Sequence, residues 1–289
     1  MQFTKMQGVG NDFVLVDEAN APAHTDWNEM ARQVCARHIS VGADGLLLVG
    51  RTAADADLSM RMFNPDGSED MCGNGLRCAA LWAHRAGWTQ TMRFTVATKE
   101  GPRRVEMLDT DDAPGLLRVD MGVPRFAPAD IPFVGASDLA NFDSQILQYS
   151  LEVDGGTFPI ASLSTGSTHT VIFGDAPSEE TFQRVSPRIE THPLFPERTS
   201  VLWATLTGQS RITVRIWERG AGETWGCGTG ACAVGVAARA LMLVPASPID
   251  VVSKGGTLCI DWPGAGQNIR MTGPAQVVFE GEVGIDAVR

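Results

Sequence analysis

Two cysteines in near-identical surroundings are the residues of this chain best suited to do chemistry. Cys72 begins the motif CGNG and Cys227 begins the motif CGTG, and an alanine-containing stretch typical of a helix follows each motif. A helix N-terminus stabilises negative charge and lowers the pKa of a cysteine placed there, which makes the thiol a usable base or nucleophile. Two equivalent thiols in one chain therefore indicate a pair that acts on a single substrate from opposite sides.

The likeness between the two halves extends beyond these motifs. Cys72 and Cys227 lie 155 residues apart (227 − 72). The other matches are 10–13 with 166–169 at an offset of 156, 99–101 with 254–256 at an offset of 155, and more loosely 118–122 with 269–273. This offset is far too long for the period of a solenoid repeat, and it is shared by separate segments. The sequence therefore predicts the duplication of a whole domain.

Paired thiols at two helix N-termini predict inversion of a stereocentre. We expect the two halves to face each other across a cleft, with backbone N–H groups of both glycine loops binding one carboxylate. A thiolate on one side then removes the proton next to that carboxylate, and the thiol on the other side returns one. The same amides stabilise the negative charge of the intermediate. This chemistry requires no cofactor, and the chain has neither a Walker A motif nor GxGxxG in a βαβ unit.

Length and charge restrict the class of protein. A chain of 289 residues is long enough for two domains of ordinary size. Its formal net charge of −11 argues against nucleic acid as a partner and favours a small-molecule substrate. No apolar run is long enough to span a membrane, and the N-terminal residues lack the apolar core of a signal peptide. We therefore expect a cytoplasmic protein with no membrane partner.

The six cysteines are predicted to be neither disulfide-bonded nor metal ligands. A cytosolic location keeps thiols reduced. Cys72 and Cys78 are separated by five residues and Cys227 and Cys232 by four, which are not the close pairs of a structural zinc site. We expect no metal. The cysteines outside the two motif positions are predicted to be small buried apolar residues: Cys35, Cys78, Cys232 and Cys259.

Strands dominate the expected secondary structure, and each half carries one central helix. Apolar or alternating stretches predict strands at 13–17, 45–49, 58–63, 92–98, 103–108 and 116–121, and at 170–173, 201–206, 212–217, 249–253 and 257–262. Helices are predicted at 27–37, with Asp26 as N-cap, and after the two cysteines at 74–87 and 229–243. A strand-rich half with one central helix, repeated once, predicts an α+β duplication. Residues 122–128, which contain Pro and Gly, are the expected crossover.

In these motifs the chain resembles the diaminopimelate epimerase family. The resemblance rests on segments spread over almost the whole chain: 5–13, 41–45, 63–69, 72–75, 195–198, 218–224, 227–230 and 271–275. It implies two pseudo-symmetric domains, each a mostly antiparallel sheet wrapped around a central helix, with the active site in the interdomain cleft. It assigns residues 1–122 and 274–289 to the first domain and 123–273 to the second.

The resemblance also implies an activity. The family converts LL-2,6-diaminopimelate to meso-diaminopimelate by cofactor-independent, two-base proton transfer, in the biosynthesis of lysine and peptidoglycan precursors. A cytoplasmic homodimer is implied as well. Cys72 and Cys227 would be the acid–base pair, supported by His169 and Glu218. The substrate-binding residues implied are Asn11, Gly45, Asn64, Gly73, Asn74, Ser167, Ser200, Glu218, Arg219, Gly228 and Thr229.

Three positions depart from the family pattern. Ser167 and Ser200 stand where the family usually has asparagine, and a hydroxyl is shorter and offers one donor. Arg270 stands where some relatives have a tyrosine at the dimer interface. The serines leave open a cofactor-independent racemase that acts on another amino acid. A different class also stays open, in which the paired thiols form a redox switch in a ligand-binding protein.

Taken without the resemblance, most of the other candidate residues have ordinary structural explanations. Asn11 and Asn64 lie next to turn signals and are typical turn-stabilising residues. Glu218 and Arg219 form a typical solvated pair, and a lone histidine such as His169 is more often structural than catalytic. Only the two cysteine loops stand out as functional from the sequence alone.

Overall fold

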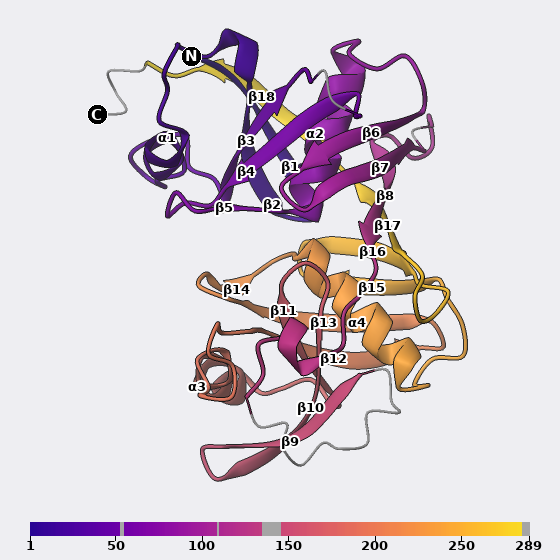
Figure 1. Cartoon of the computed structure of the whole chain (residues 1–289). Coiled ribbons are helices and arrows are strands. Elements are labelled where there is room, and N and C mark those ends of the chain that lie inside the picture. The colour runs from indigo at the N-terminus through magenta and orange to yellow at the C-terminus, as the bar shows by residue number, and fades with distance from the viewer. Residues whose placement is uncertain (53–54, 109, 135–145, 285–289) are drawn as a thin grey trace. The chain divides into compact units, whose positions relative to one another are not determined.

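The chain forms two compact units in the computed structural model, which describes residues 1–52, 55–108, 110–134 and 146–284. Unit 1 consists of Met1–Asp120 together with Thr272–Arg289, and unit 2 consists of Met121–Met271 (Figure 1). The segment 274–289 assigned to the first domain ends in residues 285–289, which lie outside the described residues. The two units are described separately below.

Unit 1 is a strand-rich unit with two α-helices. Its strands are β1 (Gln2–Gly8), β2 (Asn11–Asp17), β3 (Gly45–Gly50), β4 (Leu58–Phe63), β5 (Glu69–Asp70), β6 (Arg93–Thr98), β7 (Gly101–Met107), β8 (Leu116–Gly122) and β18 (Gln276–Glu282). Its helices are α1 (Trp27–Val34), α2 (Gly73–Arg85) and the short η1 (Glu18–Asn20). The C-terminal strand β18 pairs antiparallel with β1. The end of the chain thereby returns to the sheet in which it began.

From β10 onward, unit 2 repeats the order of strands and α-helices that unit 1 has from β1 to β8. Its strands are β9 (Leu147–Val153), β10 (Gly156–Ser164), β11 (Thr168–Phe173), β12 (Ser200–Gly208), β13 (Arg211–Glu218), β14 (Gly222–Thr224), β15 (Ile249–Ser253), β16 (Gly256–Asp261) and β17 (Ile269–Pro274). Its helices are α3 (Glu179–Glu190), α4 (Gly228–Ala240) and the short η2 (Pro128–Asp130). Strand β17 continues past the end of unit 2 into Thr272.

Strand pairing confirms the predicted internal duplication and the α+β class. In unit 1, β1–β2 is antiparallel, β2–β3 parallel, β3–β4 antiparallel, β4–β6 parallel and β6–β7 antiparallel. In unit 2, β10–β11, β11–β12, β12–β13, β13–β15 and β15–β16 repeat this series in the same order. Helices α2 and α4 each have 13 residues and begin 155 residues apart (228 − 73).

The helix that follows each cysteine motif is the centre of its unit. Helix α2 packs against β1, β2, β3, β4, β7 and β18, and α4 packs against β10, β11, β12, β15 and β16. Both helices are buried over most of their length. A helix enclosed on all sides needs small or apolar residues around its whole circumference, which explains the alanines and glycines of these segments.

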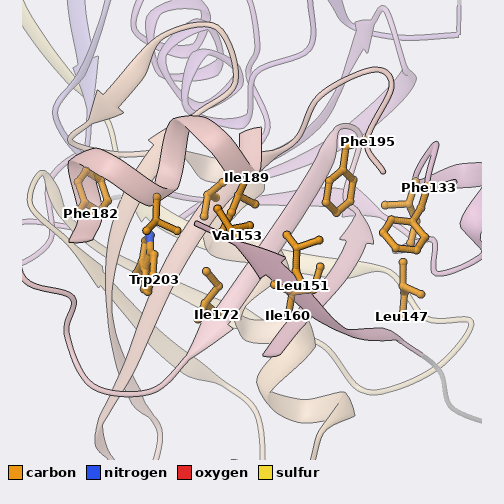
Figure 2. Packing of buried hydrophobic residues seen from close by; sticks show 13 residues of the cluster. Phe133, Leu147, Leu151, Val153, Ile160, Ile172, Phe182, Ile189, Phe195 and Trp203 are labelled. Carbon is orange, nitrogen blue, oxygen red and sulfur yellow. The ribbon is translucent and has the colours of Figure 1, made fainter. Parts of the chain in front are cut away.

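The outer helices α1 and α3 cover other strands. Helix α1 contacts β3 and β4, and α3 contacts β9, β12 and β13. In unit 2 this packing forms a large apolar cluster that includes Phe182 and Ile189 of α3 and Trp203 of β12 (Figure 2). The Trp203 indole donates a 2.9 Å hydrogen bond to Ser186 Oγ. Burying each such side chain contributes about 1.5–3 kcal/mol, so α3 is fixed firmly to its sheet.

Helix α3 is absent from the sequence prediction, and one cysteine differs from it. Ser178 caps α3 by accepting a hydrogen bond from Thr181 N, and Pro187 lies inside the helix, where proline normally argues against one. Cys35, Cys78 and Cys232 are buried as predicted, but Cys259 is only partly buried. The strand period of two explains the exception, because the neighbours of Cys259 in β16 take the buried positions.

The first turn of each central helix starts one residue earlier than predicted, at Gly73 and Gly228. Helix α1 ends at Val34, three residues before the predicted end, while Asp26 is confirmed as its N-cap. Among the residues described, no helix combines the length and apolarity that a membrane crossing requires.

Candidate active site

Both motif cysteines are the N-cap residues of the central helices, with nearly the same backbone conformation. Cys72 has φ −129° and ψ 119°, and Cys227 has φ −130° and ψ 115°. In each case the sulfur accepts a 3.4 Å hydrogen bond from the backbone N–H of the third helical residue, Gly75 or Gly230. A thiolate in this position is stabilised by the N–H group and by the positive end of the helix dipole. The predicted helix N-terminal location of both thiols is confirmed.

Close packing explains why glycine follows each cysteine at the same distance. A Cβ atom on Gly75 would lie 2.8 Å from Leu47 Cδ2, and one on Gly230 would lie 3.0 Å from Leu202 Cδ2. Leu47 and Leu202 are themselves equivalent in the 155-residue register. Each sheet thus presses a leucine against the first turn of its helix, and only glycine leaves room for it.

In unit 1, the Cys72 sulfur contacts the side chain of Asn11, which a second asparagine holds in place. Asn11 begins β2, and its Oδ1 lies 3.7 Å from Cys72 Sγ, close enough to accept the thiol proton. Asn74 Nδ2, from the first turn of α2, donates to the same Oδ1 at 3.2 Å. Asn11 is thereby placed beside the sulfur, which is consistent with its predicted role at the site.

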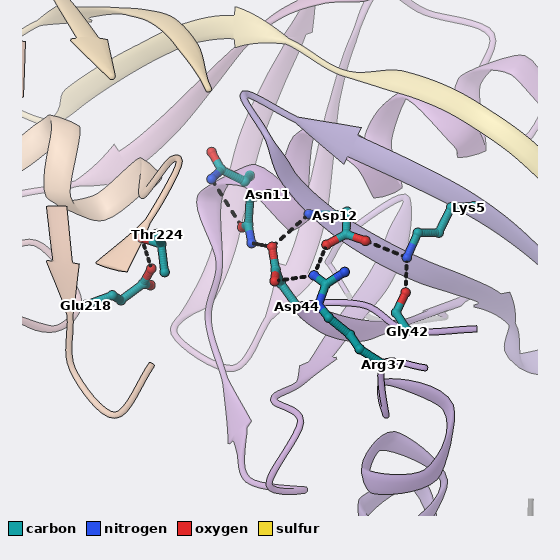
Figure 3. Close-up of polar contacts among 9 residues, drawn as sticks. Lys5, Asn11, Asp12, Arg37, Gly42, Asp44, Glu218 and Thr224 are labelled. Atoms are coloured by element: carbon teal, nitrogen blue, oxygen red, sulfur yellow. Dashed lines mark hydrogen bonds and ion pairs between the residues drawn. The ribbon is translucent and has the colours of Figure 1, made fainter. Parts of the chain in front are cut away.

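A cluster of charges fixes the far side of Asn11 (Figure 3). Asp44, just before β3, accepts hydrogen bonds from Asn11 Nδ2 at 2.8 Å and from Arg37 at 2.8 Å. Arg37 also pairs with Asp12 Oδ1 at 2.6 Å, and Lys5 pairs with Asp12 Oδ2 at 2.6 Å. Strands β2 and β3 run parallel from adjacent starting points, which brings these residues together although they are distant in sequence.

Electrostatics favour the charged forms of Asp12 and Arg37. Burial alone would raise the pKa of Asp12, but hydrogen bonds from Lys5 and Arg37 outweigh it and hold the pKa below its usual range. The hydrogen bond to Asp12 raises the pKa of Arg37 in turn. Lys5 also donates to the carbonyl oxygen of Gly42. The segment before β3 is therefore fastened to β1 and β2 by charged groups.

In unit 2, the Cys227 sulfur contacts the hydroxyl group of Thr229. Thr229 Oγ1 lies 3.4 Å from Cys227 Sγ, and either atom is able to donate the proton of this hydrogen bond. Thr165 Oγ1 donates to the backbone carbonyl of Thr229 at 2.9 Å, which fixes the loop against the end of β10. Cys227 is buried, whereas Cys72 is partly exposed. The two thiols thus share a helix position but differ in their side-chain neighbours.

His169 of β11 is buried and neutral. It is 1% exposed, Nε2 lies 3.1 Å from Ser167 Oγ, and the buried Nδ1 has no hydrogen-bond partner among the described residues. Burial, together with the nearby cation of Arg219, lowers the pKa of His169 to about 3. A protonated imidazole is strongly disfavoured here, so His169 is neutral, and its catalytic role stays a prediction.

A tight turn after β13 presents Glu218 and Arg219. Ser200 Oγ accepts a 3.1 Å hydrogen bond from Arg219 N, and Thr224 Oγ1 donates to Glu218 Oε2 at 2.9 Å. Glu190, at the end of α3, accepts a 2.9 Å hydrogen bond from Gly220 N and is 7% exposed. Glu190 is not among the residues predicted from the sequence. The one feature of the sequence that points to it is an acidic residue at the end of a helix that was itself not predicted.

The remaining predicted residues lie at or next to the ends of strands and helices. Asn64 stands in the turn after β4 and donates to Ser68 Oγ at 3.1 Å, as a turn-stabilising residue does. Gly45 begins β3 opposite Phe13. Gly73 and Gly228 are the first helical residues of α2 and α4, so their N–H groups lie at the positive helix ends. The substrate-binding roles of these residues stay predictions.

Comparisons with known proteins agree on one family. The family model described as "Diaminopimelate epimerase" matches residues 3–127 and 161–278. A protein named "Diaminopimelate epimerase" from Desulforudis audaxviator is 42% identical over 283 residues, covering 98% of this chain and 99% of the relative. One of the same name from Pelotomaculum thermopropionicum is 43% identical over 284 residues, covering 98% of each.

Solved structures show the same fold at low sequence identity. A probable proline racemase from Agrobacterium radiobacter with bound carbonate has a TM-score of 0.72 at 15% identity, covering 99% of this chain and 93% of that chain. A phenazine biosynthesis protein of the PhzF family from Bacillus anthracis has a TM-score of 0.70 at 20% identity, covering 99% of each. Two-domain architecture is thus common to this chain and to these structures.

Proposed function

The chain belongs to the diaminopimelate epimerase family, and we propose on this premise that it interconverts LL-2,6-diaminopimelate and meso-diaminopimelate. The observation that carries the proposal is the matched pair of N-cap thiols, Cys72 and Cys227, at the starts of two equivalent helices. Two chemically equal groups suit a reaction whose forward and reverse directions differ only in the face of the carbon that is deprotonated.

The proposed reaction moves one proton off and one proton onto the same carbon. One cysteine, as thiolate, takes the α-proton, and the C–H electron pair moves into the adjacent carboxylate to give an aci-carboxylate. The other cysteine, as thiol, delivers its proton to the opposite face, which restores the C–H bond with inverted configuration. The enzyme ends with the protonation states of its two thiols exchanged, so the next turnover requires exchange with solvent.

The helix N-termini are suited to stabilising the intermediate. We assign the reacting carboxylate to the first-turn N–H groups of Gly73, Asn74, Gly228 and Thr229, where partial positive charge is concentrated. These donors are fixed by the helices before the substrate binds, so stabilising the extra charge needs no reorganisation. Removing one donor of such a site typically costs about 2.7–4 kcal/mol of barrier.

The other residues are proposed to hold the substrate in place. Arg219 is a planar fork suited to the remote carboxylate, and Glu218 beside it is suited to an ammonium group. Asn11 and Asn64 are proposed to bind the substrate from unit 1. Ser167 and Ser200 bond to His169 and Arg219 N in this structure, and we propose that they act on the substrate through these partners.

We propose further that the chain acts in the cytoplasm as a homodimer, in lysine and peptidoglycan precursor biosynthesis. The family resemblance supports this proposal. Arg270, in place of a family interface tyrosine, pairs with Asp261 of its own chain at 3.0 Å. Light scattering of the purified protein at micromolar concentration tests the dimer: a monomer mass rules it out.

The function is tested by incubating the reduced protein with LL-diaminopimelate and separating the stereoisomers by chiral chromatography. We expect the meso isomer to form, and we expect Cys72→Ala and Cys227→Ala to abolish it. Cys259→Ser, which changes a cysteine outside both motifs, is the matched control and should stay active. Turnover of another amino acid instead would identify a racemase of other specificity, and no turnover of any amino acid would favour the redox switch.

A further inference from the structure

Two asparagine amides of unit 1 lie in a row between a cation and a carboxylate. Arg77 Nη2 donates to Asn74 Oδ1 at 2.8 Å. Asn74 Nδ2 donates to Asn11 Oδ1 at 3.2 Å, and Asn11 Nδ2 donates to Asp44 Oδ2 at 2.8 Å. We call these four residues the amide relay. Asn11, one of its two amides, is the residue whose Oδ1 lies 3.7 Å from Cys72 Sγ.

The chemistry of the two ends fixes the direction of the relay. An asparagine amide has one accepting end and one donating end of nearly the same shape, so an isolated amide is able to turn over. A guanidinium only donates, and a carboxylate only accepts. Turning either amide over would set two donors or two acceptors against each other at both of its contacts. Arg77 and Asp44 therefore leave one consistent orientation.

Both ends of the relay are held in place. Arg77 is fully buried and also donates to the carbonyl oxygens of Gly73 and Pro274, each at 3.3 Å. Asp44 is held by Arg37 and by Asp12 N, at 2.8 and 3.1 Å (Figure 3). Hydrogen bonds aligned in one direction polarise one another, which adds to the preference for this orientation.

We propose that Arg77 and Asp44 are positioning residues that set the orientation of Asn11, so that an accepting oxygen and not a donating NH2 group faces the Cys72 sulfur. This assignment deepens the proposed function and rests on it where turnover is concerned. The oxygen accepts the thiol proton and gives that proton a defined direction. A reversed Asn11 would point a donor at the sulfur, stabilise the thiolate and leave Asn74 facing another donor.

The equivalent positions of unit 2 have no such device. In the 155-residue register, Thr199 stands in place of Asp44, Cys232 in place of Arg77 and Thr229 in place of Asn74. Neither end therefore carries a charge that fixes a direction. The hydroxyl of Thr229, beside Cys227, is able either to donate or to accept a hydrogen bond. The relay thus distinguishes the surroundings of Cys72 from those of Cys227.

The charged groups of the relay and of the cluster beside it come from several elements. Arg77 belongs to α2, Asp12 to β2 and Lys5 to β1, while Arg37 and Asp44 lie between α1 and β3. Burial raises the pKa of Cys78 in α2, and the neighbouring Cys72 adds to this rise. A test of the relay must therefore separate the loss of charge at Asp44 from the loss of direction in Asn11.

Turnover provides the first test, through a double-mutant cycle of Asp44→Asn and Arg77→Met. A lost hydrogen bond is typically worth about 0.5–1.5 kcal/mol, so we expect each variant to lower kcat by about 3- to 10-fold with KM little changed. Because both act through one relay, the double variant should be no slower than the slower single variant. Asp112→Asn, which changes an exposed carboxylate of the same unit, should keep full kcat. Multiplicative single effects, or an unchanged kcat in Asp44→Asn, overturn the proposal.

Alkylation provides a second test that does not depend on turnover or on Arg77 variants that fail to fold. Iodoacetamide is added at fixed pH, and labelling of each cysteine is followed by mass spectrometry. We expect Asp44→Asn to speed labelling of Cys72 about fivefold, since a free amide is able to donate to the thiolate, with Cys227 unchanged. Asp12→Asn removes a carboxylate of the same cluster but leaves the relay intact. An unchanged Cys72 rate in Asp44→Asn, or an equal rise in Asp12→Asn, overturns the proposal even if the chain acts on a different substrate.

Discussion

Replacing His169 is expected to remove part of the acid sensitivity of unit 2. The imidazole is 1% exposed, its Nδ1 has no hydrogen-bond partner in the part of the chain that the structure describes, and Arg219 places a positive charge nearby. The pKa of His169 is about 3 in the folded protein, against about 6.5 for an exposed histidine. Between these values the unfolded chain binds a proton that the folded chain excludes, so folding stability falls as the pH falls below about 6.5.

The size of the effect follows from the shift. A pH of 5 lies about 1.5 units below the pKa of histidine in the unfolded chain. At 1.36 kcal/mol per unit, the free energy of unfolding is therefore about 2 kcal/mol lower than at pH 7.5. For a unit of this size that corresponds to about 4–8 °C in melting temperature. The loss should be present in the wild-type protein and absent from His169→Gln, which has no titrating group.

The assay is thermal and urea unfolding of three proteins at pH 7.5 and 5.0. Ser167→Ala serves as control, because it removes the 3.1 Å partner of Nε2 while keeping the imidazole. Carboxylates titrate in all three proteins and cancel in the comparison. We expect the wild type and Ser167→Ala to lose about 2 kcal/mol more than His169→Gln on acidification. Parallel pH dependence in the wild type and His169→Gln would refute a buried, neutral His169.

Two further predictions concern Glu190 and Cys78. Glu190→Gln leaves one accepting oxygen for the two groups that donate to this carboxylate, Gly220 N and Trp217 Nε1. The turn that carries Arg219 should loosen, and the KM for diaminopimelate should rise by about 3- to 10-fold. Steady-state kinetics with the exposed Glu180→Gln as control checks this, and an unchanged KM contradicts it. Burial raises the pKa of Cys78 to about 12, so at pH 8 only about one molecule in ten thousand carries this thiolate, and iodoacetamide should leave Cys78 unlabelled in the folded protein while labelling it after denaturation.

The fold was largely predictable because its strongest signals are local. The CGNG and CGTG motifs mark helix starts, and the shared offset between them predicted the duplication that strand pairing confirms. Helix α3 was missed because Pro187 lies within it and because its apolar residues acquire meaning only against Trp203 of another strand. Strand β10 was missed for a related reason, since Pro159 interrupts an otherwise extended stretch.

The site was predictable where residues adjoin the cysteines and not where they act from a distance. Asp44 contacts Asn11 only because β2 and β3 begin side by side in a parallel pair. Arg77 lies close to Cys72 in sequence, but its proposed role depends on full burial against Pro274 at the end of β17. Neither contact follows from residue type or spacing, because both arise from tertiary pairing.

Solvent-isotope incorporation is the measurement that tests the two-thiol account most directly. Reduced protein is incubated with LL-diaminopimelate in D2O, and deuterium at the α-carbon is followed in the substrate and the product from the first turnovers. Two thiols on opposite faces predict that meso product carries one solvent deuterium at the inverted carbon while unreacted substrate stays unlabelled. Product that retains the original protium, or undiminished epimerisation by Cys72→Ala or Cys227→Ala, would contradict the account.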